Sequence, residues 1–129
     1  MRRCKNCKSE IFKKNNVFCN NFCQNDYQYK KYICKWLGGE VNGIRGKFYL
    51  SKHIRKYLIY ICEGKCQKCG WNKINPITSQ SPLEIHHKNG DSLDNSFENL
   101  EVLCPNCHSL TNNYKSLNSK SQRIRKLFK

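Results

Sequence analysis

Long apolar segments are missing from this chain of 129 residues. Hydrophobic residues make up 38% of it, and the mean hydropathy is −0.80. No stretch approaches the roughly 20 apolar residues that a membrane-spanning helix needs, and the first residues carry no apolar run of the signal-peptide kind. The sequence therefore predicts a non-secreted, cytoplasmic protein with no membrane partner. It also predicts a core too small to stabilise the chain without help from disulfides or metal ions.

Cysteine, by contrast, is abundant, with ten residues. In a reducing compartment, closely spaced cysteine pairs are more often metal ligands than disulfides, so we favour zinc and keep disulfides as the alternative. Four thiolates complete a tetrahedral zinc shell with no open position, which makes such a site structural. The predicted ligands are Cys66, Cys69, Cys104 and Cys107 for one zinc ion and Cys4, Cys7, Cys19 and Cys23 for a second. Cys34 and Cys62 remain, and we expect both to be buried structural cysteines.

Acidic residues are scarce, with 9 against 24 lysines and arginines, and the net charge is +15. Two four-cysteine zinc sites would lower it by about two charges each, since four thiolates outweigh one Zn²⁺. The remaining charge still predicts a polyanionic partner. Residues 1–62 and 115–129 carry the excess of positive charge, whereas residues 63–114 hold 4 basic and 6 acidic residues. Residues 1–62 and 115–129 are therefore expected to attract the polyanionic partner.

The pattern along the chain predicts four segments. Residues 1–23 form a zinc knuckle or ribbon, and residues 24–61 a helical connector. The connector should hold one helix from about Asp26 to Leu37, a glycine-rich, hairpin-like link, and a second helix capped by Ser51. Residues 62–115 form a compact core, and residues 116–129 a basic tail.

The core segment predicts the order strand, loop, strand, helix. Residues 83–87 alternate apolar and polar side chains, residues 101–103 form a second short strand, and Pro105 suits the first turn of a helix running to about Tyr114. The whole chain is thus expected to be a small, zinc-stabilised α+β protein.

The core also contains LEIHHKNGD followed by FENLEVLCPNCH. This pattern resembles the HNH endonucleases (the His-Me finger or ββα-metal nucleases), with His87, Asn99 and His108 as the three letters. The resemblance implies a ββα-metal core. It also implies that His87 is the general base, that Asn99 bonds across the loop and orients it, and that His86 and His108 hold a catalytic divalent ion. Asn112, one helical turn after His108, is a possible further ligand.

Strand geometry agrees with two different roles for the adjacent histidines, because neighbouring side chains of a strand point to opposite faces. A neutral imidazole is also available as a base near pH 7. The resemblance implies hydrolysis of DNA phosphodiesters, with Mg²⁺ or another divalent ion, to 5′-phosphate and 3′-hydroxyl ends. The overall pattern of the chain resembles that of small phage-encoded or homing-type HNH enzymes. We expect a monomer that nicks one strand or a homodimer that cuts both.

Two alternatives stay open from the sequence: a non-catalytic zinc-ribbon DNA-binding protein on an HNH-like scaffold, and an RNA-directed nuclease. In either case nucleic acid would be bound by basic residues outside the central segment. The residues expected to contact DNA are Arg2, Arg3, Lys52, Arg55, Lys56, Arg123, Arg125 and Lys126.

Overall fold

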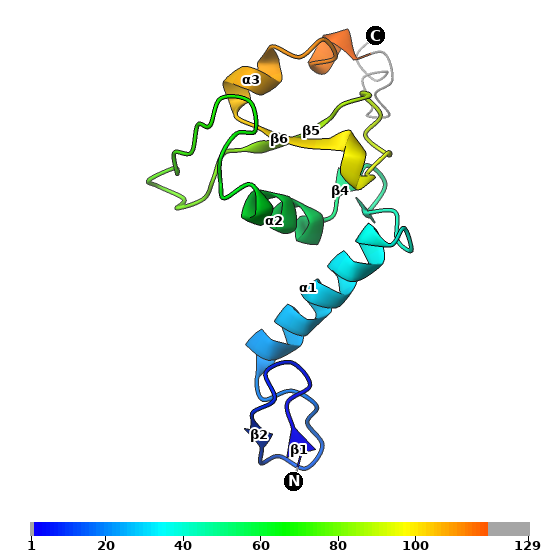
Figure 1. Cartoon of the computed structure of the whole chain (residues 1–129), viewed down its shortest axis with the longest axis vertical. Helices are drawn as coiled ribbons and strands as arrows, with labels where there is room; N and C mark the ends of the chain where they lie inside the picture. Colours follow the sequence, from blue (N-terminus) through cyan, green and yellow to red (C-terminus); the bar gives the residue numbers. More distant parts are fainter. Residues whose placement is uncertain (1, 119–129) are drawn as a thin grey trace. The chain divides into compact units, whose positions relative to one another are not determined.

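The computed structural model describes residues 2–118 and divides the chain into two compact units, Met1–Val41 and Asn42–Lys129 (Figure 1). Both belong to a small α+β protein with two four-cysteine clusters, as the sequence predicted. None of its described helices is long and apolar enough to cross a membrane. Three of the predicted DNA contacts, Arg123, Arg125 and Lys126, lie outside the described residues.

The first unit is a short hairpin followed by one long helix. Strands β1 (Arg2–Arg3) and β2 (Glu10–Ile11) pair antiparallel, and helix α1 spans Asn21–Leu37. The helix begins earlier than the sequence suggested, because the side chain of Asn20 accepts a hydrogen bond from the backbone N–H of Cys23 at 2.8 Å. Gly38 ends it, as predicted.

The apolar core of the first unit is small. Cys4, Ile11 and Cys23 form one buried cluster, with Phe18 packed against it. Two of these three buried residues are predicted zinc ligands. Ile33 and Trp36, further along α1, are also buried, but among the described residues the hairpin itself packs only on this cluster. We therefore expect metal binding to supply much of the folding free energy of the hairpin.

The second unit begins with a hairpin and a helix. Strands β3 (Ile44–Arg45) and β4 (Tyr49–Leu50) pair antiparallel, and α2 spans Lys52–Ile61. The hydroxyl of Ser51 accepts from the N–H of His53, which confirms the predicted cap. Ile54 and Leu58, one turn apart, form the buried face of α2.

Two paired strands form the centre of the second unit. Strands β5 (Glu84–His87) and β6 (Leu100–Leu103) are antiparallel, with Glu84 opposite Leu103 and His87 opposite Leu100. The short helix η1 (Phe97–Asn99) leads into β6, and α3 (Pro105–Ser109) follows it. Figure 1 shows α3 on one face of this ribbon and α2 on the other. The order strand, loop, strand, helix is therefore confirmed.

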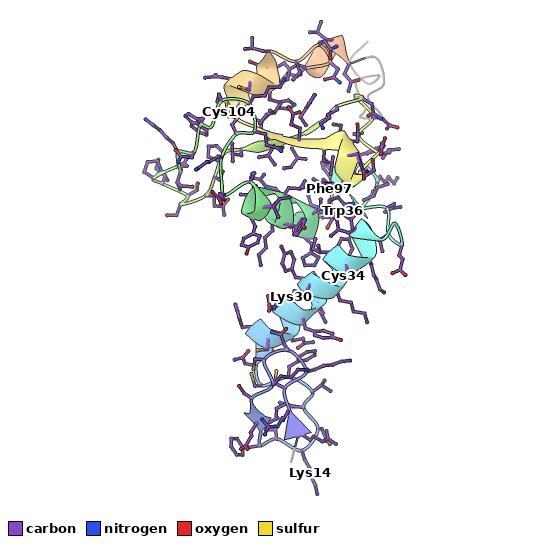
Figure 2. The ribbon with its side chains drawn as sticks, in the orientation of Figure 1. Lys14, Lys30, Cys34, Trp36, Phe97 and Cys104 are labelled. Carbon is purple, nitrogen blue, oxygen red and sulfur yellow. The ribbon has the colours of Figure 1, made fainter. Side chains whose placement is uncertain are left out.

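Two details of the sequence prediction are wrong. The last helix ends at Ser109 instead of running to about Tyr114, and the N–H groups of Leu110 and Thr111 bond carbonyls three residues back, those of Cys107 and His108. A second short helix, η2 (Lys115–Leu117), follows. Cys34 (Figure 2) is exposed on α1, not buried. Cys62 is half-buried.

Candidate metal centres and active-site cleft

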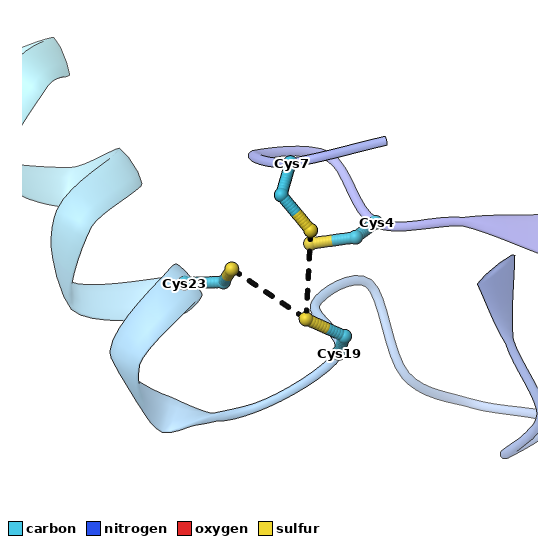
Figure 3. Close-up of side chains that lie close together, drawn as sticks. All are labelled: Cys4, Cys7, Cys19 and Cys23. Atoms are coloured by element: carbon cyan, nitrogen blue, oxygen red, sulfur yellow. Dashed lines mark hydrogen bonds between the residues drawn. The ribbon is translucent and has the colours of Figure 1, made fainter. Parts of the chain in front are cut away.

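The first cysteine cluster consists of Cys4, Cys7, Cys19 and Cys23. Its four sulfur atoms all lie within 4.8 Å of one another (Figure 3). The Sγ atom of Cys19 lies 3.7 Å from that of Cys7 and 3.5 Å from that of Cys23. This spacing suits four thiolates around one zinc ion.

The backbone around Cys4 favours its thiolate. Burial alone would raise the pKa of the Cys4 thiol, but backbone hydrogen bonds from Cys7, Cys19 and Asn6 outweigh it and lower the pKa to about 6. The hairpin and the first turn of α1 thus place the thiol with the lowered pKa, Cys4, close to three further sulfur atoms. The cluster is consistent with a structural zinc site.

The second cysteine cluster consists of Cys66, Cys69, Cys104 and Cys107, whose sulfurs also lie within 4.8 Å of one another. Backbone hydrogen bonds from Cys104, Cys69 and Lys68 outweigh the effect of burial and lower the pKa of the Cys66 thiol to about 6. This cluster, too, is consistent with structural zinc.

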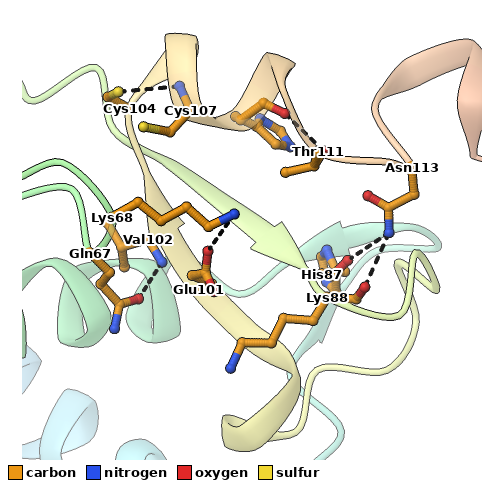
Figure 4. Close-up of polar contacts among 11 residues, drawn as sticks. Gln67, Lys68, His87, Lys88, Glu101, Val102, Cys104, Cys107, Thr111 and Asn113 are labelled. Carbon is orange, nitrogen blue, oxygen red and sulfur yellow. Dashed lines mark hydrogen bonds and ion pairs between the residues drawn. The ribbon is translucent and has the colours of Figure 1, made fainter.

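Hydrogen bonds tie the second cysteine cluster to the sheet. Gln67 donates its backbone N–H to the carbonyl of Val102 at 2.9 Å, and its side-chain oxygen accepts from the N–H of Val102 at 2.6 Å (Figure 4). Cys107 donates its N–H to the sulfur of Cys104 at the start of α3. The cluster therefore fixes α3 against β6, and with it His108, the residue after Cys107.

A cleft of about 560 Å³ opens beside β5 and α3. His86, His87 and His108 all line it. The rings of His86 and His108 meet edge to face, with centroids 5.2 Å apart. Burial first, and then the charge of His108, lower the pKa of His86. A neutral imidazole is the form that binds a metal ion.

Glu84 is a cleft residue that the sequence analysis did not predict. Its carboxylate accepts a hydrogen bond from Nδ1 of His108. This contact orients the ring and leaves Nε2 to bind an ion, the arrangement by which carboxylates support metal-binding histidines. The signal was present in the sequence, because residues two apart in a strand share a face and Glu84 lies two residues before His86. His86 and the free Nε2 side of His108 are therefore the cleft groups that could hold a divalent ion.

His87 makes a different contact from His86. Its Nε2 lies 2.6 Å from Oδ1 of Asn95. An amide oxygen only accepts hydrogen bonds, so this contact favours the tautomer with the proton on Nε2, in which Nδ1 is the basic nitrogen. Asn95 is 3% exposed, and no spacing in the sequence distinguishes it from the other asparagines of the loop.

Asn99 braces the loop that follows β5. Its Oδ1 accepts from the N–H of Asn89 at 3.0 Å, and its Nδ2 donates to the carbonyl of Asp94 at 2.7 Å. It thus bonds across the loop and holds the segment that carries Asn95, while Asn95 itself contacts the ring of His87.

The position of Asn112 differs from what a continued helix would give. The side chain is exposed and does not line the cleft, whereas Asn113, Tyr114 and Lys115 do. The early end of α3 at Ser109 explains the difference, because the helical spacing from His108 no longer holds beyond it.

Arg55 lies beside a second, smaller cleft of about 410 Å³, which shares Glu84, Ile85 and His87 with the first. Its guanidinium donates to the carbonyls of Leu83 at 2.9 Å and Ser81 at 3.1 Å, so it also holds the start of β5. The other predicted DNA contacts among the described residues are exposed: Arg2, Arg3, Lys52 and Lys56.

Comparison with known proteins adds an independent finding. Residues 66–113 match the sequence profile of the family described as HNH endonuclease. A segment of 47 residues is 45% identical to the H-N-H endonuclease F-TflIV of Escherichia phage T5, and covers 36% of this chain and 20% of that protein. A segment of 59 residues is 42% identical to the Zorya protein ZorE of Escherichia coli, and covers 46% of this chain and 14% of that protein.

The chain thus matches a fifth or less of the length of these two relatives. No solved structure matches it significantly. The matched region contains the second cysteine cluster and all three cleft histidines.

Proposed function

We propose that this chain, which belongs to the HNH endonuclease family through residues 66–113, hydrolyses phosphodiester bonds in DNA with a divalent ion bound at His86 and His108. One observation supports this above the others. A single cleft presents a histidine with a basic Nδ1, His87, and a pair of histidines suited to an ion. Base catalysis and ion binding are the two functions that metal-assisted hydrolysis requires.

In the proposed reaction, Nδ1 of His87 takes a proton from a water molecule, and the water oxygen attacks phosphorus. The bond between phosphorus and the 3′-oxygen breaks, and that oxygen takes up a proton from solvent. The products carry a 5′-phosphate and a 3′-hydroxyl. Asn95 keeps the other ring nitrogen of His87 protonated, so the basic nitrogen stays available throughout.

The ion, Mg²⁺ or another divalent cation, would polarise the phosphodiester and stabilise the negative charge on the departing oxygen. Burial lowers the pKa of His86, which favours its neutral form, and Glu84 orients the ring of His108. The two zinc ions at the cysteine clusters would be structural, because four thiolates leave no open position for substrate.

DNA would be bound chiefly by the basic flanks of the chain. Phosphate contacts give affinity and register without reading sequence. One active site per chain would nick one strand as a monomer and cut both strands as a homodimer. A phage-encoded or homing-type role fits this small enzyme, and the likeness of residues in the core to a phage H-N-H endonuclease supports it.

Cleavage of supercoiled plasmid tests the proposal. The purified chain is expected to convert plasmid to nicked or linear DNA with Mg²⁺ and to stop on brief chelation that leaves the zinc in place. His87→Ala should lower the rate by about 10²–10⁴, the usual contribution of a general base. His53→Ala, a histidine of α2 that lines neither cleft, should cleave like the wild type.

Retained cleavage by His87→Ala would contradict the assignment of the base. DNA binding by the wild type without any cleavage would identify a binding protein instead, and cleavage of RNA alone would identify an RNA-directed nuclease. Each result excludes the proposed reaction.

A further inference from the structure

The chain after α3 folds back against the turn that follows His87. Nδ2 of Asn113 donates to the carbonyls of His87 at 3.4 Å and Lys88 at 3.2 Å (Figure 4). Nδ2 of Asn118 donates to the carbonyl of Gly90 at 2.7 Å. We name residues 113–118 the clasp, because both of its ends are bonded to the segment 87–90.

Gly90 is what allows this close approach. Its φ is +79°, and a Cβ atom there would lie 2.6 Å from Oδ1 of Asn118 and 3.1 Å from Nδ2 of Asn113. Real Cβ contacts do not reach 2.6 Å, so with any other residue here the amide groups of Asn118 and Asn113 would have to shift, and their hydrogen bonds to the turn would be disturbed. The turn and the clasp therefore fit each other closely.

The clasp also contacts the ion-binding side of the cleft. The ring of Tyr114 meets that of His108 edge to face, with centroids 5.1 Å apart. Lys115 comes directly after Tyr114 and three residues before Asn118. The ring of Tyr114 contacts His108 and the amide of Asn118 bonds Gly90, so the backbone is held on both sides of Lys115.

Lys115 has an unusual backbone. Its φ is +48°, in the left-handed region that residues with a Cβ seldom occupy. Backbone strain of this kind is concentrated at functional sites, where surrounding contacts hold it in place. Here the anchored ends of the clasp provide those contacts.

Lys115 lines the active-site cleft together with His86, His87 and His108. Among the described residues it is the only lysine or arginine to do so, and the one acidic residue of the lining is Glu84. Its ammonium lies 5.1 Å from the centroid of the Tyr114 ring, a distance at which a cation is attracted by the ring face.

We propose that Lys115 is a further catalytic residue that binds a non-bridging oxygen of the scissile phosphate. Attack by water adds a second negative charge to a phosphodiester that already has one. A cation fixed beside those oxygens stabilises the attacked state more than the substrate, and so raises kcat more than affinity. This inference rests on the proposed endonuclease function.

Three substitutions of Lys115 in the full chain separate charge from backbone. Lys115→Ala should lower kcat by about 10²–10³, the usual effect of removing one group that stabilises transition-state charge, with little change in DNA affinity. Lys115→Arg should restore most of the rate. Lys115→Asn should remain as slow as the alanine variant, because asparagine tolerates a positive φ but carries no charge.

Lys73→Ala is the matched control, since it removes the same charge from an exposed loop of the second unit that lines neither cleft. Unchanged zinc content and thermal unfolding would show that each variant is folded. Wild-type rates in Lys115→Ala, or rescue by asparagine but not by arginine, would overturn the role of Lys115 while leaving the proposed function intact. A wild type that does not cleave would overturn both.

Discussion

The two cysteine clusters have similar sulfur geometry but very different surroundings. The first cluster belongs to a unit whose buried cluster is Cys4, Ile11 and Cys23, with Phe18 against it. The second cluster is bonded to a strand whose residues Val102 and Leu103 are almost fully buried. We therefore expect the first cluster to stabilise the hairpin of its unit, and the second to position His108 beside the cleft.

Positive charge and the cleft also lie in different parts of the chain. The residues that would supply DNA attraction lie mostly outside residues 63–114, and the cleft lies almost wholly inside them. Attachment and chemistry are thus expected to respond to different substitutions. Four predictions test that separation, beginning with the largest effect.

Loss of the second cysteine cluster should abolish the enzyme. Cys104→Ser removes a ligand whose neighbours place His108 in the cleft, and a structural zinc site contributes on the order of 10 kcal/mol to folding. We expect the second unit to unfold and cleavage to disappear, measured by circular dichroism and plasmid nicking. Cys62→Ser, a half-buried thiol outside both clusters, is the control and should behave like the wild type. A folded, active Cys104→Ser variant would contradict the structural role.

Loss of the first cysteine cluster should reduce attachment without stopping the chemistry. Cys19→Ser is expected to remove one zinc ion and unfold the hairpin and the start of α1, because two of the three residues in the buried cluster there, Cys4 and Cys23, are predicted ligands of the same ion. DNA affinity should fall, while the rate at saturating DNA stays close to that of the wild type. Cys34→Ser, which changes an exposed thiol of the same unit, should alter neither quantity. A lower rate at saturating DNA in Cys19→Ser would show that the first unit also contributes to the chemical step, and not only to DNA binding.

Asn95→Ala should slow the chemistry without weakening attachment. The substitution removes the acceptor for Nε2 of His87 and releases the ring to take the other tautomer. We expect kcat to fall about tenfold to hundredfold, the range typical of groups that orient a functional histidine. Asn72→Ala in the exposed loop is the control. If kcat were unchanged, another group would have to orient the base.

The smallest effect is expected from the basic residues of the first unit. Arg2→Ala combined with Arg3→Ala should weaken DNA binding and flatten its dependence on salt. The log–log slope should decrease by about 0.9 for each phosphate that the variant no longer neutralises, as measured by binding titrations at several salt concentrations. An unchanged slope would mean that these exposed arginines do not touch DNA.

The sequence predicted the features that depend on spacing. The spacing of the cysteines predicted both clusters, and the pattern of the core predicted its strand, strand, helix order. Strand alternation predicted different contacts for His86 and His87, although both line the same cleft. Glu84 was accessible to the same alternation but was overlooked.

Other features depend on how loops fold back, which no local pattern encodes. Asn95 reaches His87 across an eight-residue separation, and Lys115 enters the cleft because amide contacts and Gly90 fix the clasp. The end of α3 was missed for a related reason. The N–H groups of Leu110 and Thr111 bond carbonyls three residues back, and the helix ends where the residue types alone would permit a longer one.

We expect two tightly bound zinc ions to be structural and a third, exchangeable ion to support cleavage at the cleft. Elemental analysis of the purified chain after brief dialysis against a chelator, followed by a plasmid assay with and without added Mg²⁺, tests it most directly. We expect two zinc ions per chain, no cleavage until Mg²⁺ is added, and full recovery afterwards. A chain without zinc whose cysteines form disulfides, or one that cleaves with no added ion, would contradict it.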